Sequence, residues 1–108
     1  LLPVTHHFIP GFYIRQIFMP AGTRLTSKVH DVEHTYYISK GSAIIWEPEA
    51  GERSITAPFC GVTKAKTKRA LLILEDMIFT TFHPNPTNET DLKKIESTLI
   101  FNPDLALT

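Results

Sequence analysis

Turn-forming residues punctuate this chain at intervals of roughly 8 to 12 positions, which is the spacing of short strands joined by tight connections. The segments between them are rich in aromatic and β-branched residues, which favour strands. The pattern therefore predicts an all-β sandwich or barrel. The turn signals are Pro10-Gly11, Pro20-Ala21-Gly22, Lys40-Gly41, Glu49-Ala50-Gly51, Ala57-Pro58 and Glu75-Asp76, and the predicted strands cover residues 12–19, 34–39, 42–47, 54–57, 62–66, 70–74 and 77–83.

The last two predicted strands are separated only by Glu75-Asp76, which predicts a tight hairpin. If this hairpin pairs Ile73 with Ile78, strand alternation directs His83 outward. A register that differs by one residue would reverse that assignment.

Beyond residue 83 the chain changes character, because residues 84–88 contain prolines and polar residues that neither extend a strand nor fill a helix interior. Asn88 or Thr90 can then cap a short amphipathic helix that ends near residues 101–103. We expect its apolar stripe to cover the barrel bottom or a neighbouring subunit. The apolar tail at residues 105–107 suggests contact with another chain.

The charge balance argues against nucleic acid and membranes as partners. Lys and Arg number 11 and Asp and Glu number 11, so no net field attracts either one. No stretch approaches the roughly 18 uninterrupted apolar residues of a membrane span. The single cysteine, Cys60, excludes an intramolecular disulfide and fits a reduced compartment, where we expect a buried, unreactive thiol. A length of 108 residues fits one domain.

Five residues between the second and third turn signals have a distinctive spacing, and they are Gly22, Lys28, His30, His34 and Gly41. They resemble the first motif of the cupin family, G-x5-H-x-H-x3-E-x6-G. Lys28 stands at the first metal-ligating histidine, His30 at the second, and His34 at the glutamate. The second cupin motif is placed through residues 64–69, with Lys66 at its glycine and Arg69 at its histidine.

Three further stretches resemble the small cupin proteins encoded by tailed bacteriophages and prophages, and the similarity covers roughly residues 8–100. The resemblance implies a single-domain, RmlC-like jelly-roll barrel, a double-stranded β-helix, over residues 1–83. It also implies that a linker, a short C-terminal α-helix and a tail over residues 84–108 pack on the same domain. The three stretches are ISKG at 38–41, LEDMIFTTFHPN at 74–85 and ETDLKKIEST at 89–98.

The resemblance makes His30 and His34 candidate metal ligands. A cupin site usually combines three imidazoles with one carboxylate and leaves positions open for substrate. The other two family positions hold Lys and Arg here, and these cations do not ligate while protonated. Glu33 or His83 would have to complete the set, but alternation places Glu33 opposite His34. We therefore expect no cofactor, with one divalent transition metal as the alternative.

The same pocket has a second interpretation as an anion site. Four cationic or titratable side chains and one tyrosine are expected to gather in one cup, which would hold a carboxylate, phosphate or sulfate. The alternative is that the lysine extends to solvent and the histidines hydrogen-bond locally. The residues are Lys28, His30, His34, Tyr36 and Arg69.

Other polar and aromatic residues have simpler explanations. Trp46 ends a predicted strand, where packing is expected rather than ligand stacking. The adjacent His6 and His7 are expected to border the first strand. The alternating Lys64 and Lys66 suggest the solvated face of a strand.

The leading functional hypothesis is a non-catalytic, phage-type cupin that acts as a structural or interaction module, for example in a virion, with a degenerate metal pocket for a small anion. Its expected partners are copies of itself, in a homo-oligomer, and other virion proteins, in the virion or the host cytoplasm. The rival hypothesis is a small metal-dependent isomerase or dioxygenase that uses His30 and His34. A third possibility is a sensor that binds a small anion without turnover.

Overall fold

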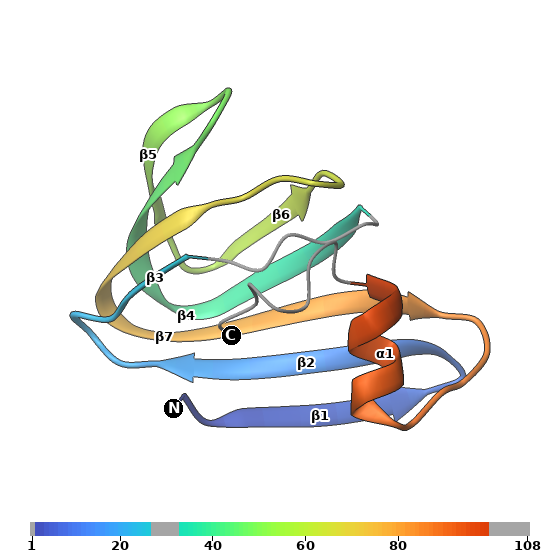
Figure 1. Cartoon of the computed structure of the whole chain (residues 1–108). Helices are drawn as coiled ribbons and strands as arrows, with labels where there is room; N and C mark the ends of the chain where they lie inside the picture. Colours follow the sequence, from blue (N-terminus) through green and yellow to red (C-terminus); the bar gives the residue numbers. More distant parts are fainter. Residues whose placement is uncertain (1, 27–32, 100–108) are drawn as a thin grey trace.

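The computed structural model describes residues 2–26 and 33–99, with side chains as far as Ile95. Strands make up most of this part of the chain, and one short helix follows them (Figure 1), so the prediction of an all-β fold is confirmed. The elements are β1 (Val4–Ile9), β2 (Gly11–Met19), β3 (Arg24–Thr26), β4 (His34–Glu47), β5 (Gly51–Thr56), β6 (Phe59–Thr63), β7 (Ala70–Asn85) and α1 (Leu92–Leu99).

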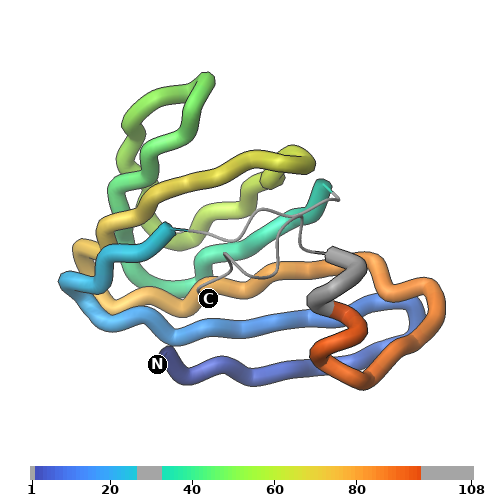
Figure 2. Tube along the Cα trace, in the orientation of Figure 1, coloured from blue at the N-terminus to red at the C-terminus, as the bar shows by residue number. Residues whose placement is uncertain are grey.

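Two long strands, β4 and β7, pair with each other and organise the fold. The first half of β4 pairs with β6 and its second half with β5. The first half of β7 pairs with β3 and its second half with β2, which carries β1 at its other edge. The antiparallel sheet therefore curls into two layers (Figure 2). We call the layer of β1, β2, β6 and the adjoining halves of β4 and β7 the large layer, and the rest the small layer.

The two layers join where β4 and β7 bend together. The register between the strands shifts here, over residues 38–43. Gly41 has a φ of 99°, and a Cβ at this position would lie 2.5 Å from the backbone oxygen of Asp76, so only glycine fits without strain. The Ser42 hydroxyl donates to Glu75 Oε1 at 2.7 Å, and the Ala21 N–H donates to Asp76 Oδ1 at 2.8 Å. Both carboxylates therefore stabilise the bend.

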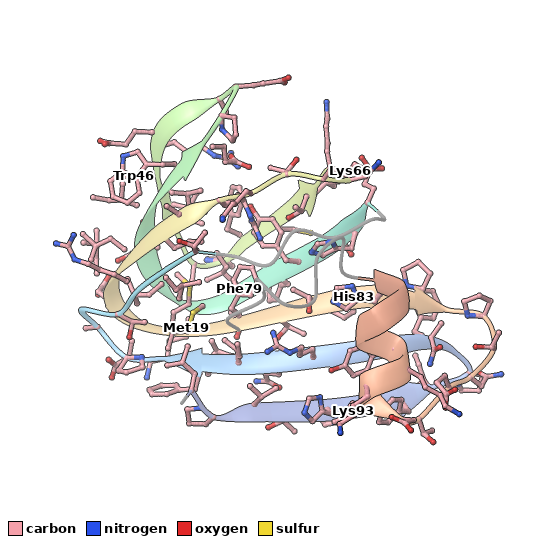
Figure 3. All side chains as sticks on the ribbon, viewed as in Figure 1. Met19, Trp46, Lys66, Phe79, His83 and Lys93 are labelled. Carbon is pink, nitrogen blue, oxygen red and sulfur yellow. The ribbon has the colours of Figure 1, made fainter. Side chains whose placement is uncertain are left out.

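The predicted hairpin at Glu75-Asp76 is wrong, because β7 runs through these residues as one strand. Three consecutive exposed residues at the bend interrupt the alternation of buried and exposed positions. The inward set that follows begins at Met77 and includes Phe79 and His83 (Figure 3). The prediction that His83 points outward is therefore also wrong. The predicted strands 34–39 and 42–47 likewise form a single strand, β4.

The hydrophobic core lies between the two layers. Its buried members come from both halves of β4 and β7 and from β2 and β5, so each layer contributes the alternate residues of its strands. They are Ile17, Met19, Tyr36, Ile38, Ala43, Ile45, Ile55, Leu71, Ile73, Met77 and Phe79.

The C-terminal segment is tied to the barrel by side-chain hydrogen bonds. Asp91 caps α1, because its Oδ1 accepts from the backbone N–H groups of Lys93 and Lys94 at 3.0 and 3.4 Å. The predicted caps were Asn88 or Thr90, but Asn88 Oδ1 instead accepts from the Gly11 N–H at 2.7 Å. The predicted helix end and apolar tail lie outside the described residues. Within the described chain, α1 is too short to cross a membrane.

Candidate functional site at the polar end of the barrel

Toward one end of the large layer, the inward side chains change from apolar to polar. The antiparallel register places these residues in rows that run across the strands, perpendicular to the chain direction. The first row is apolar, and we call the second and third the polar rows. In order, the rows contain Ile17, Phe79, Ile38 and Phe59; then Arg15, Thr81, Tyr36 and Gly61; then Tyr13, His83, His34 and Thr63.

Two imidazoles lie side by side in the third row. The ring centroids of His34 and His83 are 4.7 Å apart, and the two residues are only 4% and 3% exposed. His83 Nε2 lies 2.9 Å from Thr81 Oγ1. On the other side of His83, the Tyr13 ring stacks at 5.8 Å, and the Tyr13 hydroxyl lies 2.7 Å from His6 Nδ1. An aromatic, hydrogen-bonding chain thus extends from the interior to the edge strand β1.

A buried cation covers the second row. Arg69, which precedes β7, is 4% exposed, and its guanidinium carbon lies 5.0 Å from the centre of the Tyr36 ring and 5.9 Å from that of Phe79. These distances are typical of cation–π contacts. Burial lowers the pKa of Arg69, and burial raises the pKa of Tyr36 despite the opposing effect of the Arg69 charge. Arginine remains protonated even so, which places a positive charge inside the barrel.

Two buried hydroxyls in the polar rows make no hydrogen bond within the described residues. They are Tyr36 Oη and Thr63 Oγ1. The guanidinium groups of Arg69 and Arg53 lie near Tyr36 Oη, but neither bonds to it with good geometry. A buried hydroxyl left unsatisfied costs about 1–3 kcal/mol, so such groups need an explanation such as a bound ligand or water.

The Tyr36 ring lies directly over Gly61. A Cβ on Gly61 would stand 2.5 Å from Tyr36 Oη, which is closer than non-bonded atoms approach. Glycine at this position is therefore what lets the tyrosine occupy the interior.

A groove of about 480 Å³ lies outside these rows, between the β4–β5 turn and the β6–β7 loop. Its walls carry both signs of charge, from Glu47, Glu49, Lys64 and Lys66. Arg53 bridges to Glu47 at 3.0 Å and also contributes to the electrostatic environment of Tyr36. Arg53 therefore lines the groove and also lies close enough to Tyr36 to affect its electrostatics.

Of the residues predicted to form the pocket, the structure places His34 and Tyr36 in the polar rows and Arg69 against them. Lys28 and His30 lie outside the described residues. Glu33 is exposed, as its alternation with His34 predicted. The pocket as a binding site therefore stays a prediction.

Several members of the polar rows were not predicted from the sequence. His83 was assigned to the wrong face, and the inward positions of β2 and β6 were not singled out. The only sequence signal for them is the alternation of inward and outward residues along a strand. That signal can be applied only when the course of β7 through its bend is known. The missed residues are Tyr13, Arg15, Thr63, Thr81 and His83.

The described residues bring two imidazoles together but not a full set of metal ligands. Within residues 2–26 and 33–95, no three His, Cys, Asp or Glu side chains are placed to hold a metal ion together. His34 and His83 provide two imidazoles, whereas a cupin site of the usual composition has three and a carboxylate. The remaining donors would have to come from outside the described residues.

Outside the polar rows, the structure corrects the predicted environments of Cys60 and Lys66 and adds a hydrogen bond for Trp46. Cys60 is exposed on β6, so the prediction of a buried thiol is wrong. Trp46 is 37% exposed and donates its Nε1–H to Glu52 Oε1 at 2.6 Å. Lys66 is exposed but lies in the loop after β6, from which it projects away from the barrel, rather than on a strand (Figure 3).

Comparison with known proteins establishes the fold. No protein-family model and no curated protein matches the sequence. An RmlC-like cupin family protein with a double-stranded β-helix fold from Methanocaldococcus jannaschii is similar in structure, with a TM-score of 0.64 and 13% identity over 81% of this chain and 84% of that one. Ectoine synthase from P. lautus has a TM-score of 0.66 and 17% identity over 77% of this chain and 64% of that one.

A salicylate 1,2-dioxygenase from Pseudaminobacter salicylatoxidans has a TM-score of 0.70 and 9% identity over 91% of this chain. The match spans only 29% of the dioxygenase, so this chain corresponds to a fraction of that enzyme. At such identities the likeness shows the fold alone. The chain is a cupin jelly-roll barrel with a short C-terminal helix, as the sequence predicted. None of these three proteins is a bacteriophage protein.

Proposed function

We propose that this protein is a non-catalytic cupin module that holds a small anion, such as a carboxylate or phosphate group, at the polar end of its barrel. The observation that carries the proposal is that the buried Arg69 guanidinium lies over Tyr36, whose hydroxyl is unsatisfied within the described residues. A buried arginine and hydroxyl donors together match the geometry and charge of an oxyanion. His34 and Thr63 in the adjoining row add further donors.

Titration with inorganic phosphate and with acetate, followed by calorimetry at constant ionic strength, tests the proposal. We expect saturable binding with one site per chain. Thr63→Val should weaken it roughly 5- to 10-fold, the value of one hydrogen bond, without unfolding the protein. Thr35→Val is the matched control, because Thr35 lies on the same strand pair but is exposed on the outer face.

The proposal fails if neither anion binds saturably, or if Thr35→Val and Thr63→Val weaken binding equally. A crystal soaked in sulfate that shows no anion density beside Arg69 would also contradict it.

A metal-dependent enzyme is the second candidate, because His34 and His83 are adjacent and because two of the structural neighbours are enzymes. Near-stoichiometric Fe, Mn, Ni or Zn in the purified protein, lost in His34→Ala/His83→Ala, would favour it. In that case the sequence prediction of His30 as a ligand becomes testable by the same metal analysis of His30→Ala.

We also propose, from the sequence resemblance alone, a structural or interaction role of the phage-cupin type, in a virion or the host cytoplasm. Copurification with capsid or tail proteins would support this role. Metal-free protein that never associates with such components would count against it.

A further inference from the structure

The outward face of the large layer is nearly free of charged residues. Every second residue of its strands points outward. The first outward residues are Thr5 in β1, Phe12 in β2, Thr35 in β4, Cys60 in β6 and Ile78 in β7. From these residues to the ends of the paired segments, the outward positions of the described strands hold no Asp, Glu or Arg, and their one Lys is the exposed Lys40, which pairs with Ile78 beside the bend. Charged residues make up 20% of the whole chain and are usually commonest on surfaces, so this face is unlike an ordinary solvated one.

The same face gathers the large exposed hydrophobic side chains. Val62 is 55% exposed, Ile9 50%, Phe12 47%, Tyr37 39% and Phe18 37%, and all five point outward from this layer. An apolar patch this extensive marks an interaction surface on a soluble domain.

Charged residues reappear where the β4–β6 pairing ends. The last pair is His34 with Thr63, and the next residue on each strand is Glu33 and Lys64, both exposed. An apolar centre with a charged rim is the usual anatomy of a protein interface.

We propose that the partner is a second copy of this chain, and that two copies associate through the outward faces of their large layers in a two-fold dimer. A copy brings a face whose only Lys, Asp, Glu or Arg in the described paired strands is Lys40 beside the bend, whereas most other protein surfaces bring charges that the apolar centre of this face leaves unpaired and desolvated. Two sheets with the same twist also pack well face to face, about 10 Å apart and rotated by about 30°.

The size of the face suits a dimer. Strands spaced about 4.8 Å apart and about 20 Å long give a flat area of roughly 500 Å² for this layer. Because the side chains project from the sheet, the solvent-accessible area is larger than this flat area and approaches the roughly 800 Å² per partner of a stable interface.

Cys60 provides a direct probe of this dimer. It is the only cysteine of the chain, it is exposed, and it lies opposite Tyr37 on the same face. We expect sedimentation equilibrium to show a dimer, and we expect maleimide labelling of Cys60 to slow as protein concentration rises.

Phe12→Lys and Val62→Lys would each place a charge within the interface. We expect each to weaken dimerisation roughly 30-fold or more, the effect of losing an interface hot spot, and to remove the concentration dependence of labelling. Leu74→Lys is the matched control: Leu74 is 47% exposed, as Phe12 is, but lies at the bend outside this face. It should leave the dimer unchanged.

Circular dichroism confirms that each variant is folded, and either lysine variant suffices if the other unfolds. A protein that is monomeric at all concentrations overturns the proposal. So does an oligomer that survives both lysine variants, that Leu74→Lys weakens equally, or that leaves Cys60 labelling independent of concentration. The proposed anion site faces the barrel interior, so titration with phosphate tests the proposed function separately from the dimer.

Discussion

The two faces of the large layer reverse the usual distribution of polar and apolar side chains. At the polar end, the inward face buries His34, His83 and Arg69, whereas the outward face exposes Phe12 and Val62. Burying polar groups costs free energy unless they are paired, and exposing large apolar ones favours association. The two proposals above give each face a role, with ligand binding on the inner face and association through the outer one.

Two neighbouring tyrosines on β4 show the contrast within one step of the chain. Tyr36 is 1% exposed, with its ring stacked 5.0 Å from Phe79 and beneath Arg69. Tyr37 is 39% exposed on the outer face. Because strand alternation separates them, substitutions at the two positions probe the two faces independently.

The largest effect on stability is expected at Gly61, where the inner face is most tightly packed. Gly61→Ala should lower the free energy of unfolding by about 3 kcal/mol, because the new Cβ collides with the Tyr36 ring. Urea denaturation measures the loss. The control, Gly51→Ala, meets no atom within 4 Å and should cost only about 1 kcal/mol, for its φ of 72°.

A double variant sharpens this test. In a Tyr36→Leu background the obstructing ring is gone, so Gly61→Ala should cost much less than it does alone. An equal cost in both backgrounds would show that Tyr36 is not what Gly61 accommodates.

An intermediate effect is expected from the Tyr36 hydroxyl. Tyr36→Phe should raise the free energy of unfolding at neutral pH by about 1–3 kcal/mol, because it removes a buried hydroxyl that makes no hydrogen bond within the described residues. Burial raises the pKa of Tyr36 above its usual value of 10.0, so the unfolded chain loses this proton first. The stability linked to this group is therefore complete below pH 10 and is lost as the pH rises through the folded pKa.

Unfolding measured between pH 8 and roughly pH 11 should thus show a decline that Tyr36→Phe reduces. If Tyr36→Phe leaves the decline unchanged, the inner position of Tyr36 has no electrostatic consequence.

The sequence predicted the barrel because turn residues and strand-forming segments recur along it, and this pattern survives local irregularities. It did not predict β1 or β3: most of β1 is exposed, which leaves little alternation to detect, and β3 has only 3 residues. Glu75-Asp76 resembled a hairpin because no sequence pattern distinguishes a two-residue turn from a bend held by two carboxylates.

The site could be predicted only as far as its strands follow simple alternation. His34 and Tyr36 lie on a regular part of β4, and alternation alone places them on one face. His83 lies beyond the bend of β7, where the inward set continues at odd-numbered positions, as it does before the bend, so it was the assumed pairing of Ile73 with Ile78 that sent His83 to the wrong face. Arg15 and Tyr13 belong to a strand whose partner, the second half of β7, was assigned the wrong register.

The smallest expected effect concerns the edge of the inner face, at His6. Burial, and then the charge of Arg15, lower the pKa of His6 below its usual value of 6.5. The folded state therefore binds this proton less tightly than the unfolded chain does, so the linked stability is present above pH 6.5 and is lost as the pH falls through the folded pKa. Arg15→Gln removes one of the three causes, the third being the charge of His7, and should raise the His6 pKa, as measured by NMR titration of the imidazole Cε1–H. Arg53→Gln alters a distant guanidinium and should leave that titration unchanged. An unaltered midpoint in Arg15→Gln would mean that the charge of Arg15, in the second polar row, does not affect the pKa of His6. A ligand charge bound in that row would then not be expected to affect β1 either.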